Sequence, residues 1–189
     1  CLTLLATGGV WVIYGAGHGT QQRFGTLVMC IMAAGVAFFA TGFAFAMGGV
    51  SGMYRGLGPL TGLGSQWLPY GEGRGILGTT GFFLAGTAYD SGVYALFLFQ
   101  AALLILSASI ALLPWAERAP RLAVLAFAVL FGGLLYPAFA HWAWGGGWLA
   151  HLGQVSGHGH GFVDFAGSGV VNAVGGLTAL GACLALRSR

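Results

Sequence analysis

The sequence predicts an all-α protein whose helices cross a lipid bilayer several times, and three observations support this fold class. Hydrophobic residues make up 57% of the 189 residues and charged residues only 6%, whereas a soluble domain has about 25% charged residues. The mean hydropathy is +0.84. The 36 glycines are typical of membrane helices that pack closely through small residues. Lipid, rather than water, is therefore expected around most of the chain.

Five apolar intervals provide the candidate membrane helices, because a helix needs about 20 mostly apolar residues to span a bilayer. The predicted helices cover about residues 1–16, 26–48, 91–115, 122–140 and 165–186. The first is short. The connection over 49–90 is rich in glycine and turn signals, and the connection over 141–163 is rich in Trp, Gly and His.

The basic residues predict the orientation of these helices, because Lys and Arg are enriched on the cytoplasmic side of a membrane. Five spans place five arginines on one side and two on the other. The first group is Arg23, Arg118, Arg121, Arg187 and Arg189, and the second is Arg55 and Arg74. We therefore expect a multi-pass protein of the cell membrane (plasma or inner membrane) with its N-terminus outside.

Several function classes are disfavoured by composition and motifs. The arginines are scattered and no basic stretch alternates with exposed aromatics, so nucleic-acid binding is not expected. His151, His158 and His160 have no helical i, i+4 spacing and no accompanying Cys, so no metal site is expected. With four acidic residues in all and no legible catalytic arrangement, the sequence indicates neither an enzyme nor a cofactor.

Two polar residues lie within the predicted spans, where polar groups are costly and usually face a bundle interior. Asn172 has only Ser and Gly at the positions three and four residues away. Its amide either bonds a neighbouring helix or lines a narrow path, and spacing alone favours neither. Gln100 follows Phe99, which shares a helix face with Leu103 and Ser107. That stripe alone indicates helix packing more than a pore.

Asp164 begins the fifth predicted helix, where it can accept backbone N–H groups as an N-cap. A fixed negative charge near an outer opening would also lower the cost of bringing in a cation. The preceding connection holds Trp142, Trp144 and Trp148. These are either interfacial tryptophans or indole faces that attract a cation.

Together these segments resemble the ammonium transporter (Amt/Mep/Rh) family over its N-terminal half. The residues that lead into the third helix, and the "AER" at its cytoplasmic end, resemble those of the family. The exit of the fourth helix and the "DFAG…VV" opening of the fifth are similar too. The stretches are "GFFLAGTAYDSGVYALFLFQ", "AERA", "YPAFAHWAWGGGWLAHLG", "GHGFVDFAGSGVV" and, more loosely, "TGFAFAMGG".

The resemblance implies a fold of eleven transmembrane helices in two inverted halves of five plus a final helix. It also implies a homotrimer with one pore per subunit. This chain would be a partial ammonium-transporter domain, about five of the eleven helices. The second half would supply the rest of the pore, including a second histidine. A PII-type regulator is a possible partner by resemblance only, and the lipid bilayer surrounds the protein.

Residue by residue, the resemblance places Trp144 and Phe99 at an outer ammonium site with the Ala166 carbonyl nearby. Asp164 would stabilise that site and the helix start. Leu103 and Asn172 would line the pore, but they depart from the family's pattern. A phenylalanine is usual at the position of Leu103, and the first of two paired histidines at that of Asn172.

The function implied is ammonium transport across the membrane. NH4+ is recruited at the outer aromatic site, and NH3 or NH4+ passes through a narrow apolar pore. The departures at Asn172 and Leu103 keep two alternatives open. One is an ammonium-sensing receptor domain fused to a cytoplasmic signalling module, and the other is a degenerate, non-conducting fragment.

Overall fold

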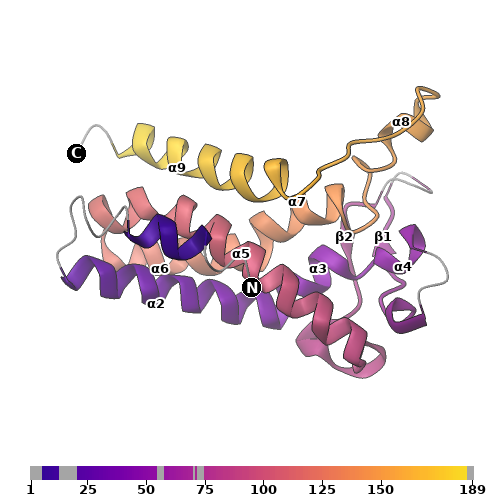
Figure 1. The fold of residues 1–189 in the computed structure, drawn as a ribbon, viewed down its shortest axis with the longest axis horizontal. Coiled ribbons are helices and arrows are strands. Elements are labelled where there is room, and N and C mark those ends of the chain that lie inside the picture. Colours follow the sequence, from indigo (N-terminus) through magenta and orange to yellow (C-terminus); the bar gives the residue numbers. More distant parts are fainter. Residues whose placement is uncertain (1–5, 13–20, 55–57, 70, 72–74, 187–189) are drawn as a thin grey trace.

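The structure is a computed structural model that describes residues 6–12, 21–54, 58–69, 71 and 75–186, and it shows long helices with loops gathered at one end (Figure 1). Four helical stretches in this part of the chain are long and apolar enough to cross a membrane. They are Arg23–Met53, Ser91–Ala116, Arg121–Ala143 and Ser168–Ala185. The composition thus correctly predicts an all-α, multi-span protein.

The first of these stretches is continuously helical as far as Met47. It consists of α2 (Gln21–Ala37), a π-helical turn (Phe38–Gly42) and α3 (Phe43–Met47), and the short α4 (Val50–Met53) follows. A helical segment over residues 6–12 precedes it within the interval predicted over 1–16. The remaining residues of that interval lie outside the described part of the chain.

The next two stretches form a pair joined by a short turn. Helix α5 runs over Ser91–Arg118, and α6 (Arg121–Leu130) continues through a π-helical turn (Phe131–Leu135) into α7 (Tyr136–Ala143). A helix of 28 residues is about 42 Å long at 1.5 Å per residue, which exceeds the ~30 Å hydrocarbon core of a bilayer.

The last stretch begins later than residue 165, where the sequence predicted it. A π-helical turn (Ser168–Ala173) leads into α9 (Val174–Ala185). Ala166 and Gly167 have left-handed φ values of 63° and 85°, which a right-handed helix cannot include. The chain therefore turns over these two residues before it becomes helical.

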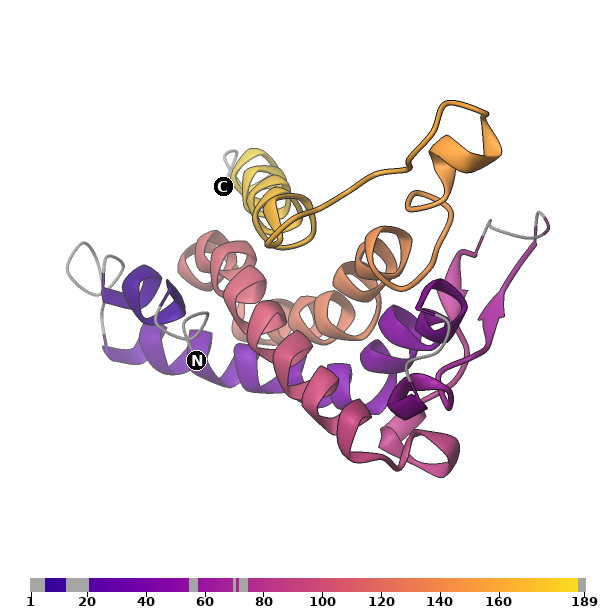
Figure 2. The same cartoon turned by 45° about the vertical axis from the view of Figure 1, so that its right-hand side comes forward.

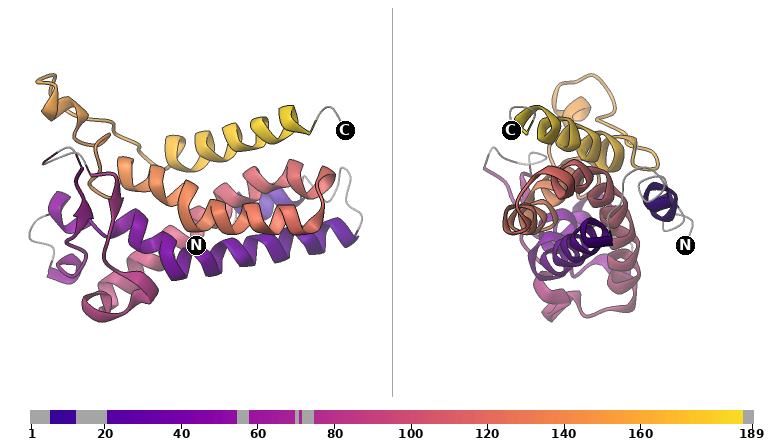
Figure 3. Two further views of the ribbon diagram at one scale, coloured as in Figure 1. Left: turned by 180° about the vertical axis from the view of Figure 1, so that it is seen from behind. Right: turned by 90° about the vertical axis from the view of Figure 1, so that its left-hand side faces the viewer.

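The bundle closes tightly where the first stretch meets α6 and α7. A Cβ at Gly42 would overlap the Gly132 carbonyl oxygen, and a Cβ at Gly132 would overlap the Ala34 carbonyl oxygen. Small residues let the two backbones approach this closely, as is common in membrane bundles. Figure 3 shows these helices running side by side over most of their length.

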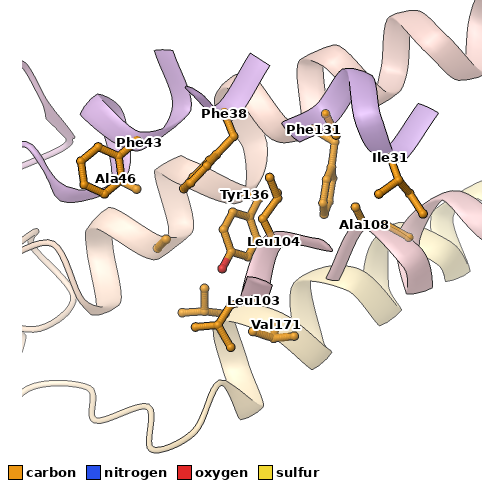
Figure 4. Close-up of a cluster of buried hydrophobic side chains, with 14 of the residues drawn as sticks. Ile31, Phe38, Phe43, Ala46, Leu103, Leu104, Ala108, Phe131, Tyr136 and Val171 are labelled. Atoms are coloured by element: carbon orange, nitrogen blue, oxygen red, sulfur yellow. The ribbon is translucent and has the colours of Figure 1, made fainter. Parts of the chain in front are cut away.

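A buried aromatic cluster fills the space beside this seam. Phe38, Phe131 and Tyr136 are fully buried, and the Tyr136 ring centroid lies 6.2 Å from each of the two phenylalanine centroids. Figure 4 shows the Tyr136 hydroxyl pointing toward the side where Leu103 and Val171 lie. The cluster thus joins the seam to α5 and to the start of the last helix.

Helix α5 is central, and α9 packs along it on the side away from α2 (Figure 2). The Ser107 hydroxyl on α5 donates to the Val171 carbonyl oxygen at 2.9 Å. A Cβ at Gly175 would lie 2.9 Å from the Ser107 carbonyl oxygen. Glycine therefore allows the close contact of these two helices.

The loops gather at the end of the bundle where α5 begins (Figure 1). An antiparallel hairpin pairs β1 (Gln66–Trp67) with β2 (Leu77–Gly78), and α8 (Leu152–Val155) lies beyond it. The buried His141 on α7 lies 3.1 Å from both the Ala46 carbonyl oxygen and Gln66 Oε1. The hairpin is thereby fixed to two helices.

The opposite end of the bundle carries arginines. The start of α2, the turn between α5 and α6, and the C-terminal end of α9 lie together there (Figure 1). Arg23 is the third residue of α2, Arg118 ends α5 and Arg121 begins α6. Three sequence-distant basic residues of the described part of the chain therefore share one end of the bundle.

Candidate functional site

One cavity, at the loop-bearing end of the bundle, brings together five of the six site residues that the sequence singled out. It has a volume of about 560 Å³. The five residues in its wall are Phe99, Leu103, Trp144, Asp164 and Ala166. They come from α5, from the C-terminal end of α7 and from the turn before the last helix. The fold thus assembles these sequence-distant residues around one space.

The rest of the wall was not predicted from the sequence. It consists of Met47, Val50, Tyr54, Leu60, Leu96 and Gln100. Four of these six side chains are aliphatic and resemble any other core residue in the sequence. Gln100 carried a signal, because an amide inside an apolar helix is unusual, but the sequence did not indicate which space it faces.

Asp164 is buried, and its carboxylate is held by three hydrogen bonds. Oδ2 accepts from the backbone N–H groups of Gly169 (3.1 Å) and Val170 (2.7 Å), and Oδ1 accepts from the Ser168 hydroxyl (2.9 Å). The two backbone N–H groups belong to the first helical turn, whose donors need outside partners. Asp164 therefore caps the helix as predicted, but from four residues before Ser168.

Trp144 is the one of the three loop tryptophans that lines the cavity. Its indole Nε1 donates to the Asp164 carbonyl oxygen at 3.0 Å, so the ring is fixed to the turn that carries the carboxylate. Trp142 donates instead to the Ile76 carbonyl oxygen (2.9 Å) and packs against Trp148 at a centroid distance of 5.8 Å. The structure thus separates one cavity tryptophan from two that support the hairpin.

Phe99 and Leu103 lie one helical turn apart on α5, so both can face the same space. Phe99 is 56% exposed and Leu103 is 7% exposed. The apolar stripe that the sequence favoured as helix packing therefore also forms cavity wall.

Ala166 contributes the most unusual backbone of the site. Its φ of 63° is uncommon for a residue with a Cβ and costs free energy relative to glycine. The three bonds to Asp164 close the turn around it. The strained turn is thus what brings Ala166 to the cavity wall.

Asn172 is not among the residues that line this cavity. It lies in the π-helical turn over Ser168–Ala173, and its Nδ2 donates to the Gly167 carbonyl oxygen at 3.3 Å. Its amide nitrogen thus has a local partner in the turn that precedes the helix. The neighbours of Asn172 three and four residues away share its face only in an α-helix, whereas this turn is π-helical. Such turns often occur at functional sites.

The chemistry of the cavity suits a small cation. The described part of the chain contains no group of three or more His, Cys, Asp or Glu residues that could hold a metal ion. The wall offers instead an indole, a phenyl ring and one buried carboxylate. An aromatic face attracts a cation through its negative quadrupole, and a fixed carboxylate nearby adds a favourable potential.

Comparison with known proteins identifies the family. The sequence model of the Ammonium Transporter Family matches residues 2–189. Ammonium transporter Amt2 of Archaeoglobus fulgidus is 38% identical over 156 residues, which are 82% of this chain and 29% of that protein. No solved structure matches the chain.

Two further relatives cover more of the chain. Ammonium transporter 1 member 1 of Solanum lycopersicum is 32% identical over 167 residues, 88% of this chain and 30% of that protein. An ammonium transporter of Bacillus subtilis is 29% identical over 180 residues, 88% of this chain and 43% of that protein. The chain therefore spans less than half the length of these relatives. The match over residues 2–189 shows that the chain belongs to the ammonium transporter family.

Proposed function

We propose that the protein containing this chain transports ammonium across a membrane, and that this chain forms the outer site that recruits NH4+. The observation that carries the proposal is the cavity where Phe99, Trp144, Asp164 and Ala166 meet in a member of this family. The three relatives described above are all named ammonium transporters. Their names favour transport over the sensing and non-conducting alternatives.

Recruitment requires that interactions with the protein replace part of the hydration that ammonium loses on entering the cavity. The Trp144 indole and the Phe99 ring offer aromatic faces, each of which attracts a desolvated cation by about 0.5–2 kcal/mol. We expect the Asp164 carboxylate to act on the cation mainly through its charge, because three hydrogen bonds already hold it in the turn. Its buried charge stabilises both the turn and a cation in the adjacent cavity.

Passage beyond the cavity would use Leu103 and Asn172 as pore-lining residues. A leucine at the inner wall would obstruct the passage of ammonia less than a phenyl ring would. The Asn172 carboxamide can donate and accept hydrogen bonds but does not titrate near neutral pH, unlike a histidine. It would therefore bind a passing ammonia molecule without relaying a proton. A homotrimer and a PII-type regulator remain expectations for the whole protein.

The arginine-bearing end of the bundle would face the cytoplasm, and the cavity would open to the outside. The motive is the shared position of Arg23, Arg118 and Arg121 at one end together with the enrichment of basic residues on the cytoplasmic side. A reporter fused after Arg189 should then be active in the cytoplasm. Activity outside the cytoplasm would contradict the orientation.

The decisive experiment is Trp144→Leu in the full-length protein, with ammonium binding measured in detergent or nanodiscs. Removal of the indole should raise the ammonium dissociation constant roughly twofold to thirtyfold, the range that cation–π energies correspond to. The unfolding temperature should fall only slightly. Unchanged affinity in a folded variant would remove Trp144 from the site.

Trp148→Leu is the matched control. It removes an indole from the same loop region, but Trp148 packs against Trp142 and does not line the cavity. Its ammonium affinity should equal that of the wild type. An equal loss in both variants would mean that the loop, rather than the Trp144 face, determines binding.

A further inference from the structure

Gln100 is a buried polar residue of the cavity wall that the proposed function leaves without a role. It lies on α5, directly after Phe99, and is only 4% exposed. Its carboxamide oxygen is buried and has no hydrogen-bond partner among the described residues. Buried polar groups in native proteins are nearly always paired. The carboxamide oxygen of this wall residue therefore has an unused capacity to accept a hydrogen bond.

The other polar groups of the wall are less available. The Asp164 carboxylate already accepts three hydrogen bonds, and the Trp144 Nε1 donates to the Asp164 carbonyl oxygen. Tyr54 is 47% exposed, so it lies where water can reach it. Among the polar atoms of this wall, the Gln100 carboxamide oxygen is thus the buried one without a hydrogen-bond partner in the described part of the chain.

We propose that the Gln100 carboxamide oxygen accepts a hydrogen bond from an N–H group of the cation bound in the cavity. The inference rests on the proposed function and assigns a further binding residue to the same site. The ligand class is ammonium or a primary alkylammonium ion. The terminal torsion of a glutamine is broad and roughly two-fold, so the carboxamide can turn its oxygen toward the cavity when a cation enters.

This hydrogen bond gives the site a property that the aromatic rings lack. An aromatic face attracts any cation of suitable size, whereas an amide oxygen bonds an ammonium ion only along an N–H direction. Gln100 would therefore contribute selectivity for cations that carry N–H groups and would orient them beside Phe99. A quaternary ammonium ion could not make this bond.

Trp115 provides a comparison on the same helix. Its Nε1 is also buried without a partner among the described residues, and its ring stacks on Phe127 at a centroid distance of 4.7 Å. It does not line the cavity. If an unpaired polar atom on α5 affected only packing, variants at Gln100 and Trp115 would behave alike.

The test uses full-length protein and titrates ammonium chloride against sodium chloride at constant ionic strength. Gln100→Met keeps the shape of the side chain and removes its polar end. We expect its ammonium dissociation constant to rise about tenfold, as expected for a lost hydrogen bond to a charged group, while its unfolding temperature stays equal or rises. Trp115→Phe should bind ammonium as the wild type does.

Gln100→Glu tests whether the side chain accepts the hydrogen bond rather than donates it. It is also the variant to measure if Gln100→Met folds poorly. A carboxylate retains the acceptor and loses the N–H donor. Unchanged or tighter ammonium binding is expected, and weaker binding in folded protein would overturn the proposal. Wild-type affinity in Gln100→Met would also overturn it, while the proposed function would stand. Absence of ammonium binding in the wild type itself would instead remove the proposed function, and this inference with it.

Discussion

Asp90 and Asp164 each precede a membrane-length helix at the loop-bearing end of the bundle, and they resemble one another in the sequence. Asp90 is the N-cap residue of α5 and accepts one backbone N–H bond, from Gly92 at 2.7 Å. Asp164 lies four residues before Ser168 and accepts three bonds from the first turn of its helix. Asp90 is half-buried, whereas Asp164 is buried at the cavity wall.

The difference shows how a residue that caps the start of a helix can have a second structural role. Asp90 satisfies an orphan donor and leaves an ordinary extended backbone at φ −145°. Asp164 closes a turn that contains the left-handed residues Ala166 and Gly167, and its own carbonyl oxygen accepts the Trp144 indole N–H. The capping bonds therefore build the cavity wall as well as the helix start.

The largest expected difference between these regions comes from replacing each aspartate by alanine. Asp164→Ala leaves the half-buried N–H group of Gly169 and the buried N–H group of Val170 without this partner, which should lower the free energy of unfolding by about 2–5 kcal/mol. Asp90→Ala removes one half-buried cap and should cost about 1 kcal/mol. Thermal unfolding of the full-length protein with and without ammonium measures both effects.

The binding readout separates the two regions further. Asp164→Ala should also weaken ammonium binding, because the turn that carries the cavity wall loosens and a fixed negative charge is lost. Asp90→Ala should leave the ammonium dissociation constant unchanged. Equal destabilisation by the two substitutions, together with unchanged ammonium binding in Asp164→Ala, would show that Asp164 is an ordinary cap.

The predictable features of this fold are those that depend on composition and on spacing over whole helices. The intervals near 26–48, 91–115, 122–140 and 165–186 each overlap a membrane-length helix of the structure, because apolar length alone limits what can cross a bilayer. Trp144 and Asp164 could be singled out from motif resemblance. Their hydrogen bond could not, because it depends on how the turn folds in space.

The features that the sequence did not reveal depend on local winding and on packing. In the described part of the chain, π-helical turns lie within or at the start of three long helical stretches, and nothing in the residue types of Ser168–Ala173 distinguishes a π turn from an α turn. The neighbours of Asn172 could therefore not be read from a 3.6-residue period. Gln100 could be recognised as unusual, but only the assembled cavity shows which wall it belongs to.

The smallest expected effect is also the sharpest contrast, because the same substitution should have opposite signs in the two regions. Ala95 lies exposed within α5, where Ala95→Gly should destabilise the protein by about 1 kcal/mol through the lower helix propensity of glycine. Ala166 has a φ of 63°, where glycine avoids a Cβ clash. Ala166→Gly should therefore stabilise the protein by up to about 1 kcal/mol, after the greater freedom of glycine in the unfolded chain is deducted. The unfolding temperatures of the two full-length variants test this. The ammonium affinity of Ala166→Gly should stay unchanged, because the backbone carbonyl is retained. A destabilised Ala166→Gly would mean that the left-handed conformation of Ala166 stores no strain.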